Sequence, residues 1–124
     1  MTKNPKPKRR YPWGDEPDPN RANYGDTHIG STSTPGCFAH GTSPYGMADL
    51  SGNVWEWTQS LYKDYPYDPK DGREDPSAGT DVARVLRGGA FNYDVNLVRC
   101  AIRNWVGPVS RRWNYGFRVV VSPL

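Results

Sequence analysis

Two acidic residues flank a glycine turn in the segment Asp49-Leu-Ser-Gly-Asn-Val-Trp-Glu56. Hard cations such as Ca²⁺ take roughly six to eight oxygen ligands from carboxylates and backbone carbonyls. Gly52 permits a sharp turn that aims carbonyl oxygens inward between Asp49 and Glu56. These residue types and their spacing are compatible with a calcium loop. The alternative is a pair of surface acids on either side of a turn that precedes a strand.

Cys37 and Cys100 are the two cysteines of the chain, and neither has a Cys or His neighbour at zinc-site spacing. We therefore expect two free, buried thiols and neither a metal finger nor a disulfide scaffold. His28 and His40 lie in loop-like segments without a matching Ser or Cys nucleophile, so we assign no catalytic residue.

Residues 92–114 combine aromatic, amide and guanidinium side chains, a mixture that is typical of binding surfaces. We expect this segment to hold an unknown protein or small ligand. The candidate ligand-binding residues are Tyr93, Asp94, Asn96, Asn104, Trp105, Arg112, Trp113 and Asn114. The alternative is an ordinary loop whose side chains pack locally.

The elements that must position these residues are short strands in a loop-rich chain. Gly and Pro number 13 and 12 among 124 residues, which is too many for long helices. Five Trp, eight Tyr and three Phe supply a small core and exclude a disordered chain. Alternating apolar residues predict strands over residues 52–58, 82–87, 98–103 and 117–121.

Strand alternation also predicts which side chains form the core. Trp55 and Trp57 share one face of their strand, and we expect that face to be buried. In the second half of the chain, strand alternation together with the sequence blocks described below assigns four residues to the core: Leu86, Phe91, Cys100 and Phe117. By contrast, we expect exposed loops at Tyr93, Asn96, Asn104, Trp105, Arg112 and Trp113.

The formal charge of +3 is distributed unevenly along the chain. Residues 1–10 carry five basic and no acidic side chains, residues 11–83 carry four basic and twelve acidic ones, and residues 84–124 carry seven Arg and one Asp. This division argues against nucleic-acid binding, which needs a basic face and a reading motif. The strand arginines pair with the acids of residues 11–83 or form an anion pocket; they are Arg84, Arg87, Arg99, Arg103 and Arg118.

Length and composition indicate one domain over residues 11–124, preceded by a basic tail or linker rich in Pro and Lys at residues 1–10. The chain has no apolar run long enough to cross a membrane, and no apolar segment of a secretory signal follows the basic tail. We expect a cytoplasmic location by default and no membrane partner.

Four sequence blocks resemble the formylglycine-generating enzyme family, which is also called the sulfatase-modifying factor domain. They occur in the family's order at residues 44–58, 84–91, 99–103 and 116–118, and Tyr11-Pro-Trp-Gly14 also fits. The most specific block is Gly-Asn-Val-Trp-Glu-Trp at residues 52–57. The resemblance implies a loop-rich α+β fold of the C-type lectin-like kind, with a small antiparallel sheet and little helix.

The same resemblance implies a structural calcium ion. Its ligands would be the side chains of Asp49 and Glu56 and the carbonyl groups of Gly52 and Val54. A second family site would correspond to Asn23 and Asp26. A small domain with little regular structure and no disulfide usually needs another source of stability, such as a bound metal ion. This need agrees with a structural role for calcium.

This chain departs from the family pattern in two ways, which limit the family properties that we expect of it. The enzyme members carry two reactive, copper-binding cysteines shortly after the Arg-Gly-Gly block, whereas residues 92–98 here contain no sulfur. Copper needs soft thiolate ligands, so we expect no copper and no oxidase chemistry. The N-terminal half of the family domain also has no counterpart, which indicates a fragment, a minimised fold or a partner chain that supplies the missing half.

These observations lead to three hypotheses on function. The first is a non-catalytic ligand-binding module with a C-terminal display surface, which resembles the variable proteins diversified by retroelements. The second is a fragment of a formylglycine-generating or related oxidase. The third is a structural domain attached to an upstream catalytic partner.

Overall fold

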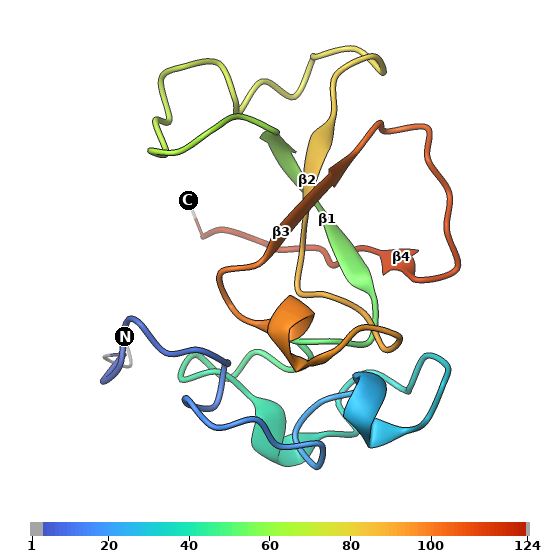
Figure 1. The fold of residues 1–124 in the computed structure, drawn as a ribbon. Helices are drawn as coiled ribbons and strands as arrows, with labels where there is room; N and C mark the ends of the chain where they lie inside the picture. Colours follow the sequence, from blue (N-terminus) through green and yellow to red (C-terminus); the bar gives the residue numbers. More distant parts are fainter. Residues whose placement is uncertain (1–3, 124) are drawn as a thin grey trace.

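The computed structural model describes residues 4–123, so residues 1–3 of the expected tail and Leu124 lie outside the described residues. The sheet consists of β1 (Trp55–Leu61), β2 (Arg84–Arg87), β3 (Arg103–Val106) and β4 (Tyr115–Gly116). The described part of the chain has no α-helix; its helical turns are the 3-10 helices η1 (Gly25–Thr27), η2 (Ala39–Gly41) and η3 (Val95–Val98). The loop-rich α+β fold is therefore confirmed (Figure 1).

The strand order in the sheet is β3-β2-β1-β4. The pairs β1–β2 and β2–β3 are antiparallel, but β4 runs parallel to β1, so the expectation of a purely antiparallel sheet is wrong. Residues 107–114 explain the difference. They carry the chain from Val106, which lies at the Arg84 end of β2, back to Trp55 at the beginning of β1. A strand that enters the sheet there must follow the direction of β1.

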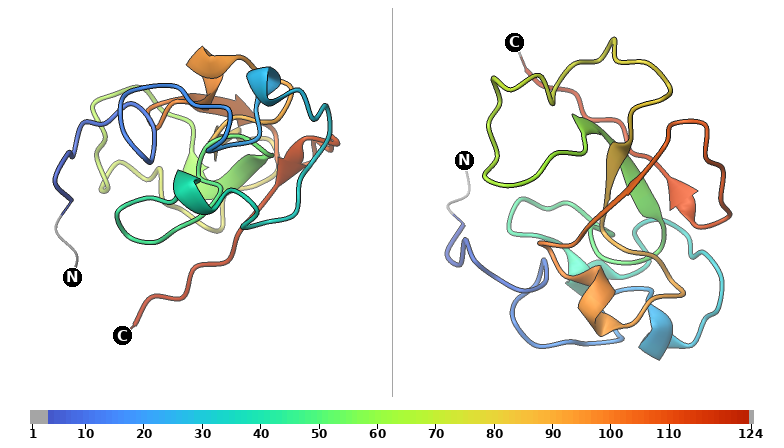
Figure 2. Two further views of the ribbon diagram at one scale, coloured as in Figure 1. Left: turned by 90° about the horizontal axis from the view of Figure 1, so that it is seen from below. Right: turned by 45° about the horizontal axis from the view of Figure 1, so that its top comes forward.

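Loops extend from both ends of this sheet. The N-terminal loops with η1 and η2 lie beyond the beginning of β1, and residues 62–83 form a long excursion beyond its end (Figures 1 and 2). No helix in the described residues combines the length and the apolar character needed to cross a membrane. The sheet is thus the element that relates all the loops to one another.

The predicted strands at residues 52–58 and 82–87 are confirmed, with shifted boundaries. Strand β1 begins only at Trp55 because Gly52 and Asn53 have positive φ angles of 77° and 66°, which lie far from the φ of a regular strand. The predicted strand at residues 98–103 is wrong, since Val98 ends η3 and the strand starts at Arg103. The carboxylate of Asp94 caps η3 by accepting a hydrogen bond from the Asn96 N–H, 2.7 Å away.

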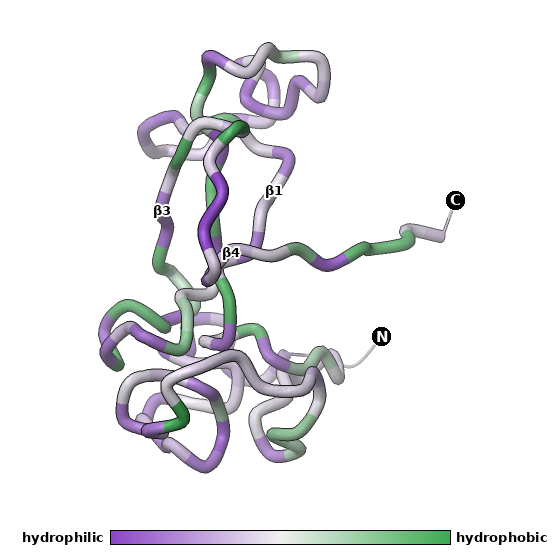
Figure 3. Tube along the Cα trace, turned by 90° about the vertical axis from the view of Figure 1, so that its right-hand side faces the viewer, coloured by the Kyte–Doolittle hydropathy of each residue, from purple (hydrophilic) through white to green (hydrophobic). Residues whose placement is uncertain are grey.

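The predicted strand at residues 117–121 is also wrong. The chain leaves the sheet after β4 and extends away from it (Figure 3). Phe117 is 76% exposed, so it is not a core residue. Its aromatic side chain follows the two-residue strand β4 and has no neighbouring strand to cover it.

Two hydrophobic clusters form the core. One joins Tyr11, Ala22, Tyr24 and Val98 among the N-terminal loops, and the other joins Trp55, Leu86 and Ala90 on one face of the sheet. The expected burial of Trp55, Leu86 and Phe91 is confirmed, and Trp57 packs against the second cluster. The expected burial of Cys37 and Cys100 is wrong, because both thiols are exposed. Cys100 lies in a turn, so strand alternation does not apply to it.

The backbone at Gly52 and Asn53 connects the two clusters. The Gly52 N–H donates to the Gly88 carbonyl (2.7 Å), and the Asn53 N–H donates to the Asn23 carbonyl (2.8 Å). The Asn53 carbonyl accepts from the Phe91 N–H at 3.0 Å. A Cβ atom on Gly52 would collide with the Asn23 carbonyl oxygen, so this contact requires glycine.

Replacing this glycine tests the junction. We predict that Gly52→Ala lowers the free energy of unfolding by at least about 2 kcal/mol, because it adds a steric clash to an unfavourable positive φ. Gly46 is the matched control: it has the same φ of 77°, but its added Cβ would meet nothing within 4 Å. Gly46→Ala should therefore cost only about 1 kcal/mol, the penalty of the left-handed conformation alone. Equal losses for the two variants in denaturant titrations would contradict the close contact at Gly52.

Candidate functional site

The structure brings three of the four expected calcium ligands together. Asp49, Val54 and Glu56 line one pocket, which Arg118 also enters from the segment after β4. Gly52 is not part of this pocket lining, because it is buried against Asn23. Three of the four residues thus lie beside one another, and Gly52 does not join them.

The guanidinium of Arg118 holds this loop in the structure. Its Nε donates to Glu56 Oε2 at 2.6 Å, and its Nη2 contacts Glu56 Oε1. The remaining bonds run from Nη1 to the Ala48 carbonyl (2.8 Å) and from Nη2 to the Asp49 carbonyl (2.9 Å). This pairing with Glu56 raises the pKa of Arg118, so the guanidinium stays charged. The sequence placed Arg118 among the arginines that could pair with the acids of residues 11–83, but it did not identify Glu56 as the partner, because 62 residues separate the two.

The donor types of the loop fit Ca²⁺, but both Glu56 oxygens already accept hydrogen bonds from Arg118. Asp49 Oδ2 accepts from the Gly36 N–H at 2.6 Å. Within residues 4–123, no three His, Cys, Asp or Glu side chains gather as a metal cluster. Calcium binding stays a prediction, and the geometry adds a condition: Ca²⁺ would compete with Arg118 for the Glu56 carboxylate.

The second expected calcium position is divided between two environments. Asn23 is buried, and its side-chain oxygen has no hydrogen-bond partner among the described residues. Its amide nitrogen donates to the Ser31 carbonyl (2.8 Å) and the Ser33 hydroxyl (3.1 Å). Asp26, by contrast, is exposed in η1. The binding of a second calcium ion therefore also stays a prediction.

The expected ligand-binding residues fall into two groups. Five side chains are exposed: Asp94, Asn96, Trp105, Arg112 and Trp113. The others contribute to the fold. Tyr93 packs edge-on against Trp55, with ring centroids 5.6 Å apart, and Asn104 is half-buried on β3. Asn114 is buried, and its side chain donates to that of Asn92 at 3.2 Å. The expectation that Tyr93 and Asn104 lie in exposed loops is therefore wrong. Trp105 is exposed as expected, but it lies on β3 and not in a loop.

The exposed tryptophans are held by neighbouring rings. Trp105, which is 49% exposed, stacks on Tyr62 with centroids 4.1 Å apart and 22° between the ring planes. Trp113 is 67% exposed, and the centroid of its ring lies 4.9 Å from that of Phe91. It also lines an open hollow formed by residues 110–113. Ring packing limits the motion of both side chains while leaving an aromatic face accessible to solvent.

Comparison with known proteins assigns the family. Residues 4–123 match the model of the sulfatase-modifying factor enzyme 1-like domain. The chain belongs to this family. It is 34% identical to hercynine oxygenase of Mycolicibacterium thermoresistibile in an alignment of 119 positions that covers 90% of this chain and 26% of that protein. It is also 39% identical to the mouse inactive C-alpha-formylglycine-generating enzyme 2 in an alignment of 131 positions that covers 90% of this chain and 36% of the mouse protein.

Among solved structures, Treponema denticola variable protein 1 superimposes with a TM-score of 0.68 and 25% identity. The match covers 90% of this chain and 41% of that protein. This family domain thus spans between about a quarter and two fifths of the lengths of these three proteins. The matches confirm the sequence-based family assignment and the fold.

The competition between calcium and Arg118 gives a direct test of the loop. Millimolar Ca²⁺ should raise the melting temperature relative to chelator, because a ligand at a hundredfold excess over its Kd adds about 2.7 kcal/mol. The rise should be larger in Arg118→Gln, which frees both Glu56 oxygens, and absent in Glu56→Gln. Identical melting curves with Ca²⁺ and with chelator, in both the unmodified chain and Arg118→Gln, would eliminate the calcium loop.

Proposed function

We propose that this domain is a non-catalytic binding module. Its display surface lies within residues 92–114 and is centred on the exposed side chains of Asp94, Asn96, Trp105, Arg112 and Trp113. The observation that carries the proposal is the pair of exposed tryptophans held by ring packing on Tyr62 and Phe91. An exposed aromatic side chain with restricted motion loses little further conformational entropy on binding, and Trp dominates many binding interfaces.

The positions of these tryptophans in the fold also suit binding. Trp105 belongs to β3, which is an edge strand of the described sheet, and Trp113 belongs to the loop that connects β3 with β4. That loop projects beside the sheet (Figure 2). It also carries the exposed cations Arg111 and Arg112. A surface of this composition favours a partner with aromatic or apolar groups and negative charge.

The absence of reactive thiols supports a non-catalytic role. Residues 92–98 contain no cysteine, and Cys100 is an exposed thiol in the turn that follows η3. The name of the mouse relative includes the word inactive, which is compatible with loss of chemistry on this fold. The name of the Treponema neighbour describes a variable protein, and we extend that property to this surface as part of the proposal. In related copies of the domain, substitutions should then concentrate at the five exposed positions.

Similarity to hercynine oxygenase supports a second candidate, in which the domain contributes to an oxidative enzyme. The two candidates differ in their response to metal and oxygen. An oxidative enzyme consumes oxygen in the presence of its substrate and metal, whereas the binding module does not. Oxygen uptake by the whole protein, measured with a cysteine peptide and copper and separately with hercynine, distinguishes the two candidates.

Peptides selected from a random library on the immobilised domain provide the probe for the display surface. We predict that Trp105→Ala and Trp113→Ala each weaken the binding of the selected peptides about tenfold or more, which corresponds to about 1.4 kcal/mol. Tyr45→Ala is the control, because Tyr45 is 57% exposed but lies outside residues 92–114. Affinities can be measured by calorimetry.

The melting temperatures of all three variants should stay close to that of the unmodified domain, since surface changes usually alter stability by less than about 0.5 kcal/mol. An unchanged affinity in both tryptophan variants would refute the display surface. An equal loss in Tyr45→Ala would do the same, because binding would then not depend on the location of the aromatic side chain.

A further inference from the structure

A pocket of about 200 Å³ lies on the sheet face opposite the Trp55 cluster. In the pairing of β2 with β3, Arg87 lies opposite Arg103, and both point away from Leu86, which belongs to the cluster. Strand residues form the floor of the pocket, and the loop after β1 forms its wall. The lining residues are Thr58, Ser60, Leu61, Tyr65, Tyr67, Arg73, Val85, Arg87 and Arg103.

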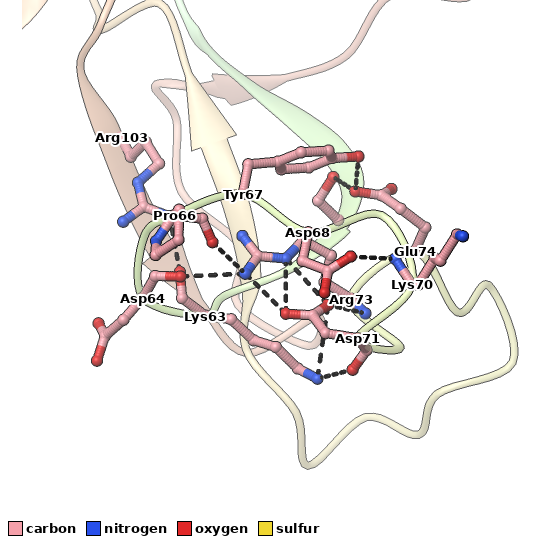
Figure 4. A network of polar contacts seen from close by, with 11 residues as sticks. Lys63, Asp64, Pro66, Tyr67, Asp68, Lys70, Asp71, Arg73, Glu74 and Arg103 are labelled. Atoms are coloured by element: carbon pink, nitrogen blue, oxygen red, sulfur yellow. Dashed lines mark hydrogen bonds and ion pairs between the residues drawn. The ribbon is translucent and has the colours of Figure 1, made fainter.

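The wall is built on a buried arginine. Arg73 is 3% exposed, and its Nη2 donates to Asp71 Oδ2 at 2.7 Å and to the carbonyls of Asp64 (3.0 Å) and Pro66 (3.3 Å) (Figure 4). This pairing lowers the pKa of Asp71 to about 2, so the carboxylate neutralises Arg73 at neutral pH. The loop is thereby fixed over the sheet, and Arg73 brings no uncompensated charge to the pocket.

The other two guanidiniums have no such partner. Within residues 4–123, neither Arg87 nor Arg103 takes part in an ion pair. Arg87 donates to backbone carbonyls of residues 100–102, and Arg103 donates to the Lys63 carbonyl at 2.9 Å. Like charges directly opposite each other on paired strands repel, and here both are half-buried. A bound anion would relieve this repulsion.

Among the described residues no carboxylate lines the pocket, and two acidic side chains of the loop are already paired. Asp71 pairs with Arg73 and Lys63, and Glu74 Oε1 accepts hydrogen bonds from Ser60 (2.7 Å) and Tyr67 (3.0 Å). Above the sheet, the Arg103 guanidinium lies 4.0 Å from the centroid of the Tyr65 ring. The pocket therefore presents two unpaired cations beside aromatic and aliphatic walls.

We propose that this pocket binds a small organic carboxylate. The carboxylate lies between Arg87 and Arg103, which supply charge-assisted hydrogen bonds, and the apolar body lies against Tyr65, Leu61 and Val85. The volume suits a body of about one aromatic ring and is below the roughly 300 Å³ at which pockets for drug-sized ligands begin. None of the lining residues belongs to the expected ligand-binding set, but the pocket adjoins the display surface: the Arg103 guanidinium lies 4.9 Å from the centroid of the Tyr62 ring on which Trp105 stacks.

Benzoate is the probe, and benzamide is its neutral isostere. In titrations followed by NMR, benzoate should shift the backbone amides of Thr58, Val85 and Arg103, whereas benzamide should not. Arg103→Gln should weaken benzoate binding about tenfold or more, and Arg103→Lys should retain part of it. Arg10→Gln removes an exposed arginine outside the pocket and should leave the affinity unchanged.

Equal binding of benzoate and benzamide, or an unchanged affinity in Arg103→Gln, would overturn the proposal. If Arg103→Gln does not fold, two other measurements test the pocket: the comparison of benzoate with benzamide in the unmodified chain, and benzoate binding by Tyr65→Ala. Tyr65 is 61% exposed, so its truncation should weaken binding and spare the fold. A short peptide ending in phenylalanine, compared with its C-terminal amide, tests whether the carboxylate can also come from a chain terminus.

Discussion

The structure depends on the close contact of two backbone segments at Gly52 and Asn23. This contact allows Asn53 to bond with Asn23 on one side and with Phe91 on the other, while Gly52 bonds with Gly88. Three parts of the chain meet there: the N-terminal loops, the start of β1 and the segment after β2. A fold without α-helices in its described residues has few other ways to align such distant segments, and a side chain at residue 52 would separate them.

Arginine side chains join distant segments of this domain, as helices and disulfides do in other small domains. Arg118 joins the segment after β4 to the loop before β1, and Arg73 fixes the long loop over the sheet. The uneven charge distribution suggested that the C-terminal arginines would neutralise the acids of residues 11–83. Among the described residues only Arg118 does so, whereas Arg87 and Arg103 donate to backbone carbonyls. The positive charges of Arg87 and Arg103, which no acidic side chain pairs with among the described residues, are the basis of the proposed carboxylate pocket.

The sequence motifs were sufficient to predict the family and the fold class. Local sequence patterns predicted the wrong secondary structure where contacts between distant segments determine it. Val98 was predicted to lie in a strand, but it is a buried residue of η3, the helical turn that Asp94 caps. Phe117 was also predicted to lie in a strand, but it follows β4 where the chain has left the sheet. The pairing of Arg118 with Glu56 leaves no local signal because it spans 62 residues. Trp105 and Trp113 were recognisable as exposed, whereas their supports, Tyr62 and Phe91, depend on the tertiary structure.

Native-state hydrogen exchange at the junction tests this account most directly. If the contact at Gly52 and Asn23 holds the domain together, the amides of Gly52, Asn53 and Phe91 should exchange only through global unfolding, at the same free energy as Leu86 in the sheet. The display surface and the carboxylate pocket would then rest on one cooperative unit. Exchange of the three junction amides through local opening, at a free energy well below that of Leu86, would contradict the central role of this contact.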